Sequence, residues 1–234
     1  MHILRNVLDM RPGTDYLRVM PLDIKICGLS TPETVAAALD GGASHIGFIF
    51  FARSPRNVTP ETAAGLRAAA HGRAQAVAVT VDADDAFLDA LVATMAPDML
   101  QLHGAETPAR VAAVKARFGL PVMKALPVST AGDLDAVAPY AGIADRFLFD
   151  AKPPKGSELP GGNGVAFDWS LLSRLPAGTD YLLSGGLDAA NVGAAMARAN
   201  PPGLDVSSGV ESAPGIKDVA RIRAFFDAVA TARR

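Results

Sequence analysis

The chain has 234 residues, of which half are hydrophobic and a fifth are charged, and its formal net charge is −2. This apolar fraction excludes a mainly disordered chain, and the balanced charge argues against a nucleic-acid-binding domain, which is usually basic. Every apolar run is far shorter than the roughly 20 residues that a membrane-spanning helix needs, so we expect no membrane segment.

Residues 1–22 show no strand or helix periodicity, and we expect them to form an N-terminal extension outside the folded domain. From Asp23 onward, short apolar runs alternate with longer segments of helical period. The early runs show little polar alternation, which is typical of parallel strands buried on both faces. The eight predicted strands are Ile24–Cys27, His45–Phe50, Ala76–Val81, Met99–Leu102, Val122–Ala125, Arg146–Phe149, Tyr181–Leu183 and Leu204–Val206.

Helix-start signals follow several of these strands. Thr31-Pro32, Thr59-Pro60 and Thr107-Pro108 each place a capping hydroxyl before a proline, and Ser30 with Glu33 has the spacing of a capping box. Three helices are therefore expected to begin at these signals, the first of them covering Thr34–Leu39. The other predicted helices are Asp84–Met95, Thr130–Val137, Asp168–Arg174, Asn191–Ala199 and Asp218–Thr231.

Eight strand–helix units within residues 23–234 predict one α/β domain. The two regular solutions are a closed (β/α)8 TIM barrel and an open doubly wound sheet. We favour the barrel because the units number eight and no G-x-G-x-x-G sequence follows the first strand. In addition, the glycine-rich turns follow the seventh and eighth strands, where barrels commonly bind phosphate.

Active sites of such barrels lie at the C-terminal ends of the strands, so two residues there are candidates for proton transfer. Cys27 ends the first strand; its thiolate could act as a base, or the residue could be a small buried hydrophobe. Asp150 ends the sixth strand before a loop rich in Gly and Pro, and could serve as an acid or as a turn residue. Asp82 and Asp168 are competing carboxylates, although the position of Asp168 favours a helix cap.

The remaining candidates suit an anionic ligand. Gly185-Gly186 and Ser208-Gly209 could form a phosphate cradle from main-chain N–H groups, or simply two tight turns. Arg56, more than Arg53, is placed to hold a carboxylate, with a solvated surface charge as the alternative. His103 could be catalytic, contact the ligand or be a satisfied core histidine.

No metal or cofactor motif is present. Cys27 is the only cysteine and the four histidines are scattered, so we expect no disulfide, no metal site and no cofactor. Without a signal peptide, a cytoplasmic location is expected. The residues alone therefore predict a barrel that isomerises or cleaves a phosphorylated small molecule by acid–base chemistry.

Several sequence strings together resemble the phosphoribosylanthranilate isomerase family of tryptophan biosynthesis. The resemblance runs in the same order from about Asp23 to the C-terminus, and the loop over residues 151–160 is somewhat longer than is usual in that family. The strings are KICGL (25–29), GFIFFARSPRNV (47–58), LQLHG (100–104), FDA (149–151), GGNGVAFDWSLL (161–172), LSGGLDAANV (183–192) and DVSSGVESAPGIKD (205–218).

The resemblance implies an isomerase that converts N-(5'-phosphoribosyl)anthranilate to 1-(2-carboxyphenylamino)-1-deoxy-D-ribulose 5-phosphate. This Amadori rearrangement, an aldose-to-ketose shift, needs no cofactor. Cys27 matches the family's general base, Asp150 its general acid and Arg56 the residue that holds the anthranilate carboxylate. The phosphate would lie against residues 185–186 and 208–209.

Such a mechanism requires a protonated acid and a deprotonated base at the same pH. We therefore expect the pKa of the Cys27 thiol to be lowered, or its thiolate to be stabilised by the substrate's positive iminium ion. The expected partner is a small phosphosugar, with no nucleic-acid or membrane partner, and the protein is expected to be a monomer or a homodimer.

Three other functions fit parts of the pattern. A phosphosugar isomerase of the histidine-biosynthesis type would use two carboxylates, which a cysteine at the first strand end disfavours. An aldolase would form a Schiff base through Lys124, although this lysine is better placed to pair with a carboxylate. A phosphate-binding barrel without catalysis would not need the thiol of Cys27.

Overall fold

The computed structural model describes residues 22–70, 72–152, 156–157, 161–162, 164 and 166–234. Eight parallel strands form a closed barrel in chain order, because β1 pairs with β2 on one side and with β8 on the other. The predicted TIM barrel is therefore confirmed. The strands are β1 (Asp23–Cys27), β2 (His45–Phe50), β3 (Gln75–Thr80), β4 (Met99–Leu102), β5 (Val122–Val128), β6 (Arg146–Ala151), β7 (Tyr181–Leu183) and β8 (Gly203–Val206).

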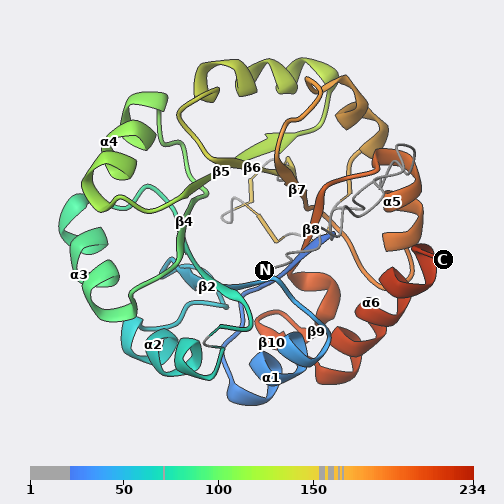
Figure 1. Ribbon diagram of the computed structural model, residues 1–234, viewed down its shortest axis with the longest axis horizontal. Helices are drawn as coiled ribbons and strands as arrows, with labels where there is room; N and C mark the ends of the chain where they lie inside the picture. Colours follow the sequence, from blue (N-terminus) through green and yellow to red (C-terminus); the bar gives the residue numbers. More distant parts are fainter. Residues whose placement is uncertain (1–21, 71, 153–155, 158–160, 163, 165) are drawn as a thin grey trace, which may run out of the picture.

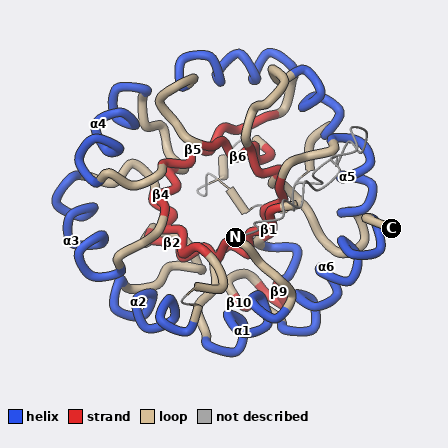
Figure 2. The backbone as a smooth tube through the Cα atoms, viewed as in Figure 1, coloured by secondary structure: helices blue, strands red, loops and turns tan. Residues whose placement is uncertain are grey.

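Helical segments form a ring around this barrel (Figures 1 and 2). Two of the predicted helices, η1 and η2, are 3-10 segments rather than α-helices. Pro139 lies inside η1, where a proline removes a main-chain donor. The segments are α1 (Pro32–Asp40), α2 (Pro60–Ala69), α3 (Asp85–Met95), α4 (Pro108–Phe118), η1 (Ala131–Tyr140), η2 (Trp169–Arg174), α5 (Val192–Ala199) and α6 (Val219–Ala232).

The predicted helix starts have the expected side-chain caps. Thr31, Thr59 and Thr107 each accept a hydrogen bond from the main-chain N–H three residues later, ahead of a proline in the first turn. The cap of α1 is thus Thr31 rather than Ser30. Asp168 caps η2 by accepting from the N–H of Ser170 at 3.0 Å, so it serves the helix rather than the barrel mouth.

Two apolar regions make up the core, and the strand period of two separates them. Ile24 and Ile26 of β1 pack between the barrel and the helices, whereas Cys27 belongs to the barrel interior. The interior is filled by side chains from β1, β3, β4, β5, β6 and β7, namely Cys27, Val77, Val79, Met99, Met123, Ala125, Leu148 and Leu182. The barrel is thus a packed core with its open end at the strand C-termini.

A short hairpin after β8 was not predicted. A single 3-10 turn, η3 (Ser208–Val210), leads into β9 (Glu211–Ala213), which pairs antiparallel with β10 (Ile216–Lys217). The predicted extension over residues 1–22 lies outside the described residues except for Leu22, which packs against the core. None of the described helices is long and apolar enough to cross a lipid bilayer.

Candidate active site

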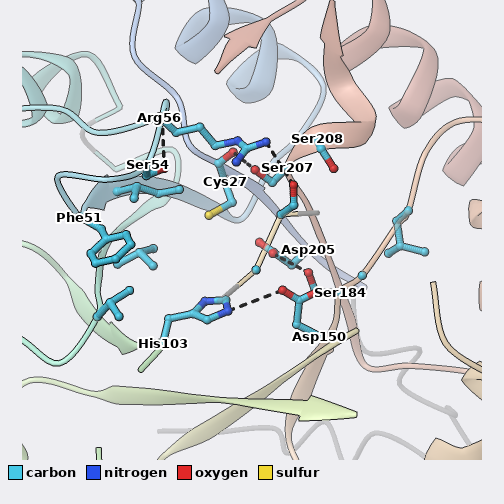
Figure 3. Close-up of a pocket in the computed structure, with 17 residues that line it drawn as sticks. Cys27, Phe51, Ser54, Arg56, His103, Asp150, Ser184, Asp205, Ser207 and Ser208 are labelled. Carbon is cyan, nitrogen blue, oxygen red and sulfur yellow. Dashed lines mark hydrogen bonds and ion pairs between the residues drawn. The ribbon is translucent and has the colours of Figure 1, made fainter. Parts of the chain in front are cut away.

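A cavity at the C-terminal mouth of the barrel brings together most of the predicted site residues (Figure 3). They come from six different strands or the loops that follow them. The predicted residues in its wall are Cys27, Arg56, His103, Asp150, Gly185 and Ser208. Gly186 and Gly209 follow two of these along the chain and lie just outside the lining.

Cys27 lies at the end of a buried polar row. Lys25, two residues earlier on β1, is fully buried, and its Nζ lies 2.8 Å from Asp205 Oδ1. The Oγ of Ser184 donates to the other oxygen of Asp205 at 3.0 Å. Opposite Cys27 on β2 stands Gly47, where a Cβ would come within 3.1 Å of both the Cys27 Sγ and the Lys25 Nζ. Glycine at this position leaves room for the thiol and the ammonium group.

Burial raises the pKa of the Cys27 thiol, and the opposing influence of the Lys25 ammonium group only partly offsets it. The expected lowering of this pKa is therefore wrong for the unliganded protein. Burial also disfavours the charged form of Lys25, but the carboxylate of Asp205 and the nearby Cys27 outweigh it and raise the pKa of Lys25 to about 12. Lys25 is thus a fixed positive charge beside the thiol.

Asp150 faces His103 across the cavity. The Nε2 of His103 lies 3.6 Å from Asp150 Oδ2, while Asp150 Oδ1 accepts from the N–H of Ala151 at 2.9 Å. The amide nitrogen of Gln101 lies 2.9 Å from His103 Nδ1, so in this amide orientation the neutral ring carries its proton on Nε2, toward Asp150. A Cβ on Gly161 would overlap the Asp150 carboxyl group, which shows how closely this loop residue approaches.

Arg56 forms a buried cluster with the hairpin. Its Nε and Nη2 donate to the two carboxylate oxygens of Glu211 at 2.7 and 2.8 Å. Lys217 pairs with the same carboxylate, and its Nζ also donates to the main-chain oxygen of Ser207 at 3.2 Å. Burial would raise the pKa of Glu211, but the two cations outweigh it and lower that pKa. Glu211 is therefore held as a carboxylate.

Backbone groups dominate the wall formed by β7 and β8. Gly185 and Gly186 have φ values of +89° and +64°, a conformation that glycine adopts without strain. A Cβ on Gly209 would overlap the carbonyl oxygen of Leu187, so the η3 turn lies directly against the turn after β7. No described acceptor takes a hydrogen bond from the N–H of residues 185, 186, 208 or 209. These amides suit an anion.

The opposite wall of the cavity is apolar and comes from β2 and β3. Its lining residues are Ile49, Phe51, Val79 and Val81, and Phe51 lies across the cavity from Ser208 in Figure 3. Cys27 lies between the two walls. The cavity can therefore hold a ligand with an aromatic end and an anionic end.

Three other candidates lie away from these contacts. Lys124 is buried and donates to Glu106 Oε2 at 2.8 Å and to the carbonyls of Leu102 and Gly104. All three ammonium protons are thus engaged, which disfavours Schiff-base formation. Asp82 accepts from the N–H of Ala105 at 2.7 Å, and Arg53 is exposed beside a neighbouring cavity. Within the described residues, no cluster of His, Cys, Asp and Glu is arranged to hold a metal ion.

The family model for N-(5'-phosphoribosyl)anthranilate (PRA) isomerase matches residues 24–228, which include every strand end that lines the cavity. The chain belongs to the phosphoribosylanthranilate isomerase family. The resemblance noted in the sequence is thereby confirmed, and the match begins at the second residue of β1.

Relatives within the phosphoribosylanthranilate isomerase family cover nearly the whole chain. The N-(5'-phosphoribosyl)anthranilate isomerase of Mesorhizobium japonicum is 71% identical over 214 residues, 92% of this chain and 98% of that protein. Monomers of the dimeric Thermotoga maritima isomerase superpose with a TM-score of 0.75 at 29% identity, covering 90% and 99% of the two chains. An isomerase in complex with reduced 1-(o-carboxyphenylamino)-1-deoxyribulose 5-phosphate gives 0.76 at 28% identity, with the same coverage.

Five polar residues of this phosphoribosylanthranilate isomerase site were not singled out from the sequence. Lys25 could have been found, because it shares a strand face with Cys27 two residues later. The others depend on pairings between distant segments, which a local pattern does not reveal. They are Ser184, Asp205, Glu211 and Lys217.

Proposed function

We propose that the protein isomerises N-(5'-phosphoribosyl)anthranilate to 1-(2-carboxyphenylamino)-1-deoxy-D-ribulose 5-phosphate, with Cys27 as general base and Asp150 as general acid. The observation that carries this proposal is that the thiol and the carboxyl group line one cavity from β1 and β6. They lie between an apolar wall and a wall whose main-chain N–H groups have no acceptor among the described residues.

The two walls orient the substrate. The phosphate would bind the amides around Gly185, Gly186, Ser208 and Gly209, because unpaired N–H groups stabilise an anion without a lysine or arginine. The anthranilate ring would pack against the apolar wall, and its carboxylate would reach Arg56. The ribose carbons would then lie near Cys27 and Asp150, between the two ends.

Ring opening needs an acid. Asp150 would give its proton to the furanose ring oxygen while the bond between C1' and that oxygen breaks, and the anthranilate nitrogen supplies the electron pair that forms an iminium ion. The carboxylate left behind has two nearby donors, the N–H of Ala151 and the Nε2–H of His103. We assign His103 this supporting role.

The second step needs a base. The Cys27 thiolate would take the proton from C2', and the C–H electron pair moves to neutralise the iminium ion and gives an enolamine. The enolamine then tautomerises: the C2' hydroxyl loses its proton, C1' gains one, and the ketose forms. The positive iminium ion and the Lys25 ammonium group both favour the thiolate, which offsets the effect of burial.

Turnover by point variants tests these two roles. Loss of substrate fluorescence is followed for the wild type, Cys27→Ala, Cys27→Ser and Asp150→Asn, with substrate generated in the cuvette. We expect kcat to fall by about 10²- to 10⁴-fold in each variant, the usual contribution of general acid–base catalysis. Asp135→Asn, at an exposed position of η1, serves as the matched control and should be unaffected.

Affinity for the reduced product analogue separates catalysis from folding, and it should change only a few-fold in the three site variants. A wild type that binds the analogue but does not turn over substrate would contradict the isomerase proposal. That result would favour a phosphate-binding barrel without catalysis. The expected cytoplasmic location, the monomeric or dimeric state and the boundary of the extension at residue 22 stay predictions.

A further inference from the structure

Arg56 approaches the cavity in one fixed orientation, and Glu211 sets it. Both residues are 5% exposed, and the carboxylate accepts from Nε and Nη2 at 2.7 and 2.8 Å in a bidentate ion pair. The Nη2 group also donates to the carbonyl oxygen of Gly162 at 3.4 Å. The guanidinium plane is therefore held on one edge before any ligand arrives.

The Nη1 group of Arg56 has no hydrogen-bond acceptor among the described residues. Arg56 lines the cavity, and in Figure 3 its side chain runs from beside Ser54 toward Ser207 and Ser208. A planar guanidinium group fixed on one edge presents the remaining donors in one direction. An anion in the cavity next to Arg56 would meet these donors without reorganising the arginine.

The carboxylate of Glu211 is itself held in place. It also pairs with Lys217, which is 8% exposed and donates to the Ser207 carbonyl at 3.2 Å. Arg221 donates to the main-chain oxygen of Glu211, and the N–H of Gly215 donates to its carboxylate at 3.2 Å. Two groups of the hairpin, the Lys217 ammonium and the Gly215 N–H, therefore hold the carboxylate, and Arg221 of α6 holds the main chain of Glu211.

We propose that Glu211 is a positioning residue that aims Arg56 at the aryl carboxylate of the substrate, and that the β9–β10 hairpin thereby sets the preference for a carboxylated aromatic group. The inference rests on the proposed function. Glu211 does not touch the reacting atoms; it acts through Arg56. Its two alternatives, a purely electrostatic role and a purely structural one, make different predictions.

Binding of two matched ligands tests this. One is reduced 1-(o-carboxyphenylamino)-1-deoxyribulose 5-phosphate, and the other is the same compound with hydrogen in place of the carboxyl group. The ratio of their dissociation constants, measured by calorimetry, gives the preference for the carboxylate. We expect a wild-type preference of at least about tenfold, typical of a buried charge-assisted hydrogen bond.

Removing the charge of Glu211 separates positioning from electrostatics. Glu211→Gln leaves two cations without their anion, so an electrostatic role predicts that the carboxylate preference rises. A positioning role predicts instead that the carboxylate preference falls at least about fivefold. Glu211→Gln combined with Lys217→Met restores the wild-type net charge of the cluster, and the preference should remain low in this double variant.

A conservative variant covers the case in which Glu211→Gln does not fold. Glu211→Asp keeps the charge, but its side chain is one methylene shorter and holds the carboxylate farther from Arg56. The carboxylate preference should therefore fall about threefold or more. The matched control for Glu211→Gln is Glu61→Gln, which replaces glutamate by glutamine at an exposed position of α2. Binding of the carboxyl-free ligand should stay within about threefold in every folded variant.

The outcomes are distinct. A preference that stays at the wild-type value or rises in the folded Glu211 variants overturns the inference. A fall of both affinities together, with the ratio unchanged, indicates a structural role and also overturns it. A wild type without turnover of N-(5'-phosphoribosyl)anthranilate contradicts the proposed function instead, and is seen before any variant is made.

Discussion

At the scale of single residues, the proposed role of Cys27 as general base makes activity depend on the surroundings of its thiol. Burial raises the pKa of the thiol, while the ammonium group of Lys25 acts in the opposite direction. A general base works only in its deprotonated form, so kcat/KM should rise with pH until the thiol of the free enzyme is ionised. If Cys27 is the general base, the rising limb of the pH profile therefore reports on its thiol.

Lys25→Met should move this rise to higher pH. The variant removes the nearby positive charge and leaves the carboxylate of Asp205 facing the thiol, and both changes disfavour the thiolate. We expect kcat/KM at pH 7 to fall roughly tenfold and to recover in part as the pH increases.

The pH profile of kcat/KM for both proteins provides the measurement. Lys115→Met is the control, because it breaks an ion pair with Asp145 that is more than a third exposed. A Lys25→Met profile that coincides with the wild-type profile would show that this lysine does not act on the thiol.

At the scale of elements, the turns that follow β7 and β8 depend on glycine. Gly209 packs so closely on the carbonyl of Leu187 that a methyl group cannot fit without displacing main-chain atoms. Gly209→Ala should therefore separate the two turns and weaken binding of inorganic phosphate and of the product analogue at least about tenfold. Equilibrium binding of both ligands checks this.

Gly65→Ala provides the contrast within the same chain. Gly65 lies at an exposed position inside α2, and a Cβ there would meet no atom within 4 Å. Alanine should leave ligand binding unchanged and stabilise the protein by about 0.5–1 kcal/mol, because it lowers the entropic cost of helix formation. Equal effects of the two substitutions on phosphate binding would contradict the packing argument.

The sequence predicted these elements unevenly. Strands such as His45–Phe50 and Met99–Leu102 were predicted at their observed bounds, since buried parallel strands are continuous apolar runs between turn signals. The β9–β10 hairpin was missed because strands of three and two residues carry no measurable periodicity. In the sequence, the charged residues Glu211 and Lys217 are typical of an exposed loop. Only the folded structure shows that Glu211 pairs with Arg56, which is 155 residues away.

At the scale of the whole molecule, one buried histidine links folding to pH. Burial lowers the pKa of His45 to about 4, with Asp23 and Asp205 acting against it and Arg146 and Lys25 reinforcing it. In the unfolded chain this pKa is about 6.5. Between these values only the unfolded chain binds the proton, so stability rises with pH across this range and is lost as the pH falls.

The size of this effect is on the order of 3 kcal/mol between pH 6.5 and pH 4, from the difference of the two pKa values. His45→Gln removes the titrating group. The loss of free energy of unfolding between pH 6.5 and pH 4 should therefore be smaller in the variant than in the wild type, by about this amount. Urea denaturation of the wild type and the variant at several pH values measures the two slopes. Parallel slopes would mean that His45 titrates alike in both states.

Closure of the barrel between β1 and β8 also determines when the active site forms during folding. Lys25 meets Asp205 only because β1 pairs with β8, and these two residues are 180 positions apart. During synthesis, this ion pair cannot form until the chain has been made as far as Asp205 in β8. Until then the lysine has no carboxylate beside it, and the cysteine lacks the surroundings on which its ionisation depends. Isomerase activity is therefore a late event in the life of each new chain, and its onset would report the final step of folding.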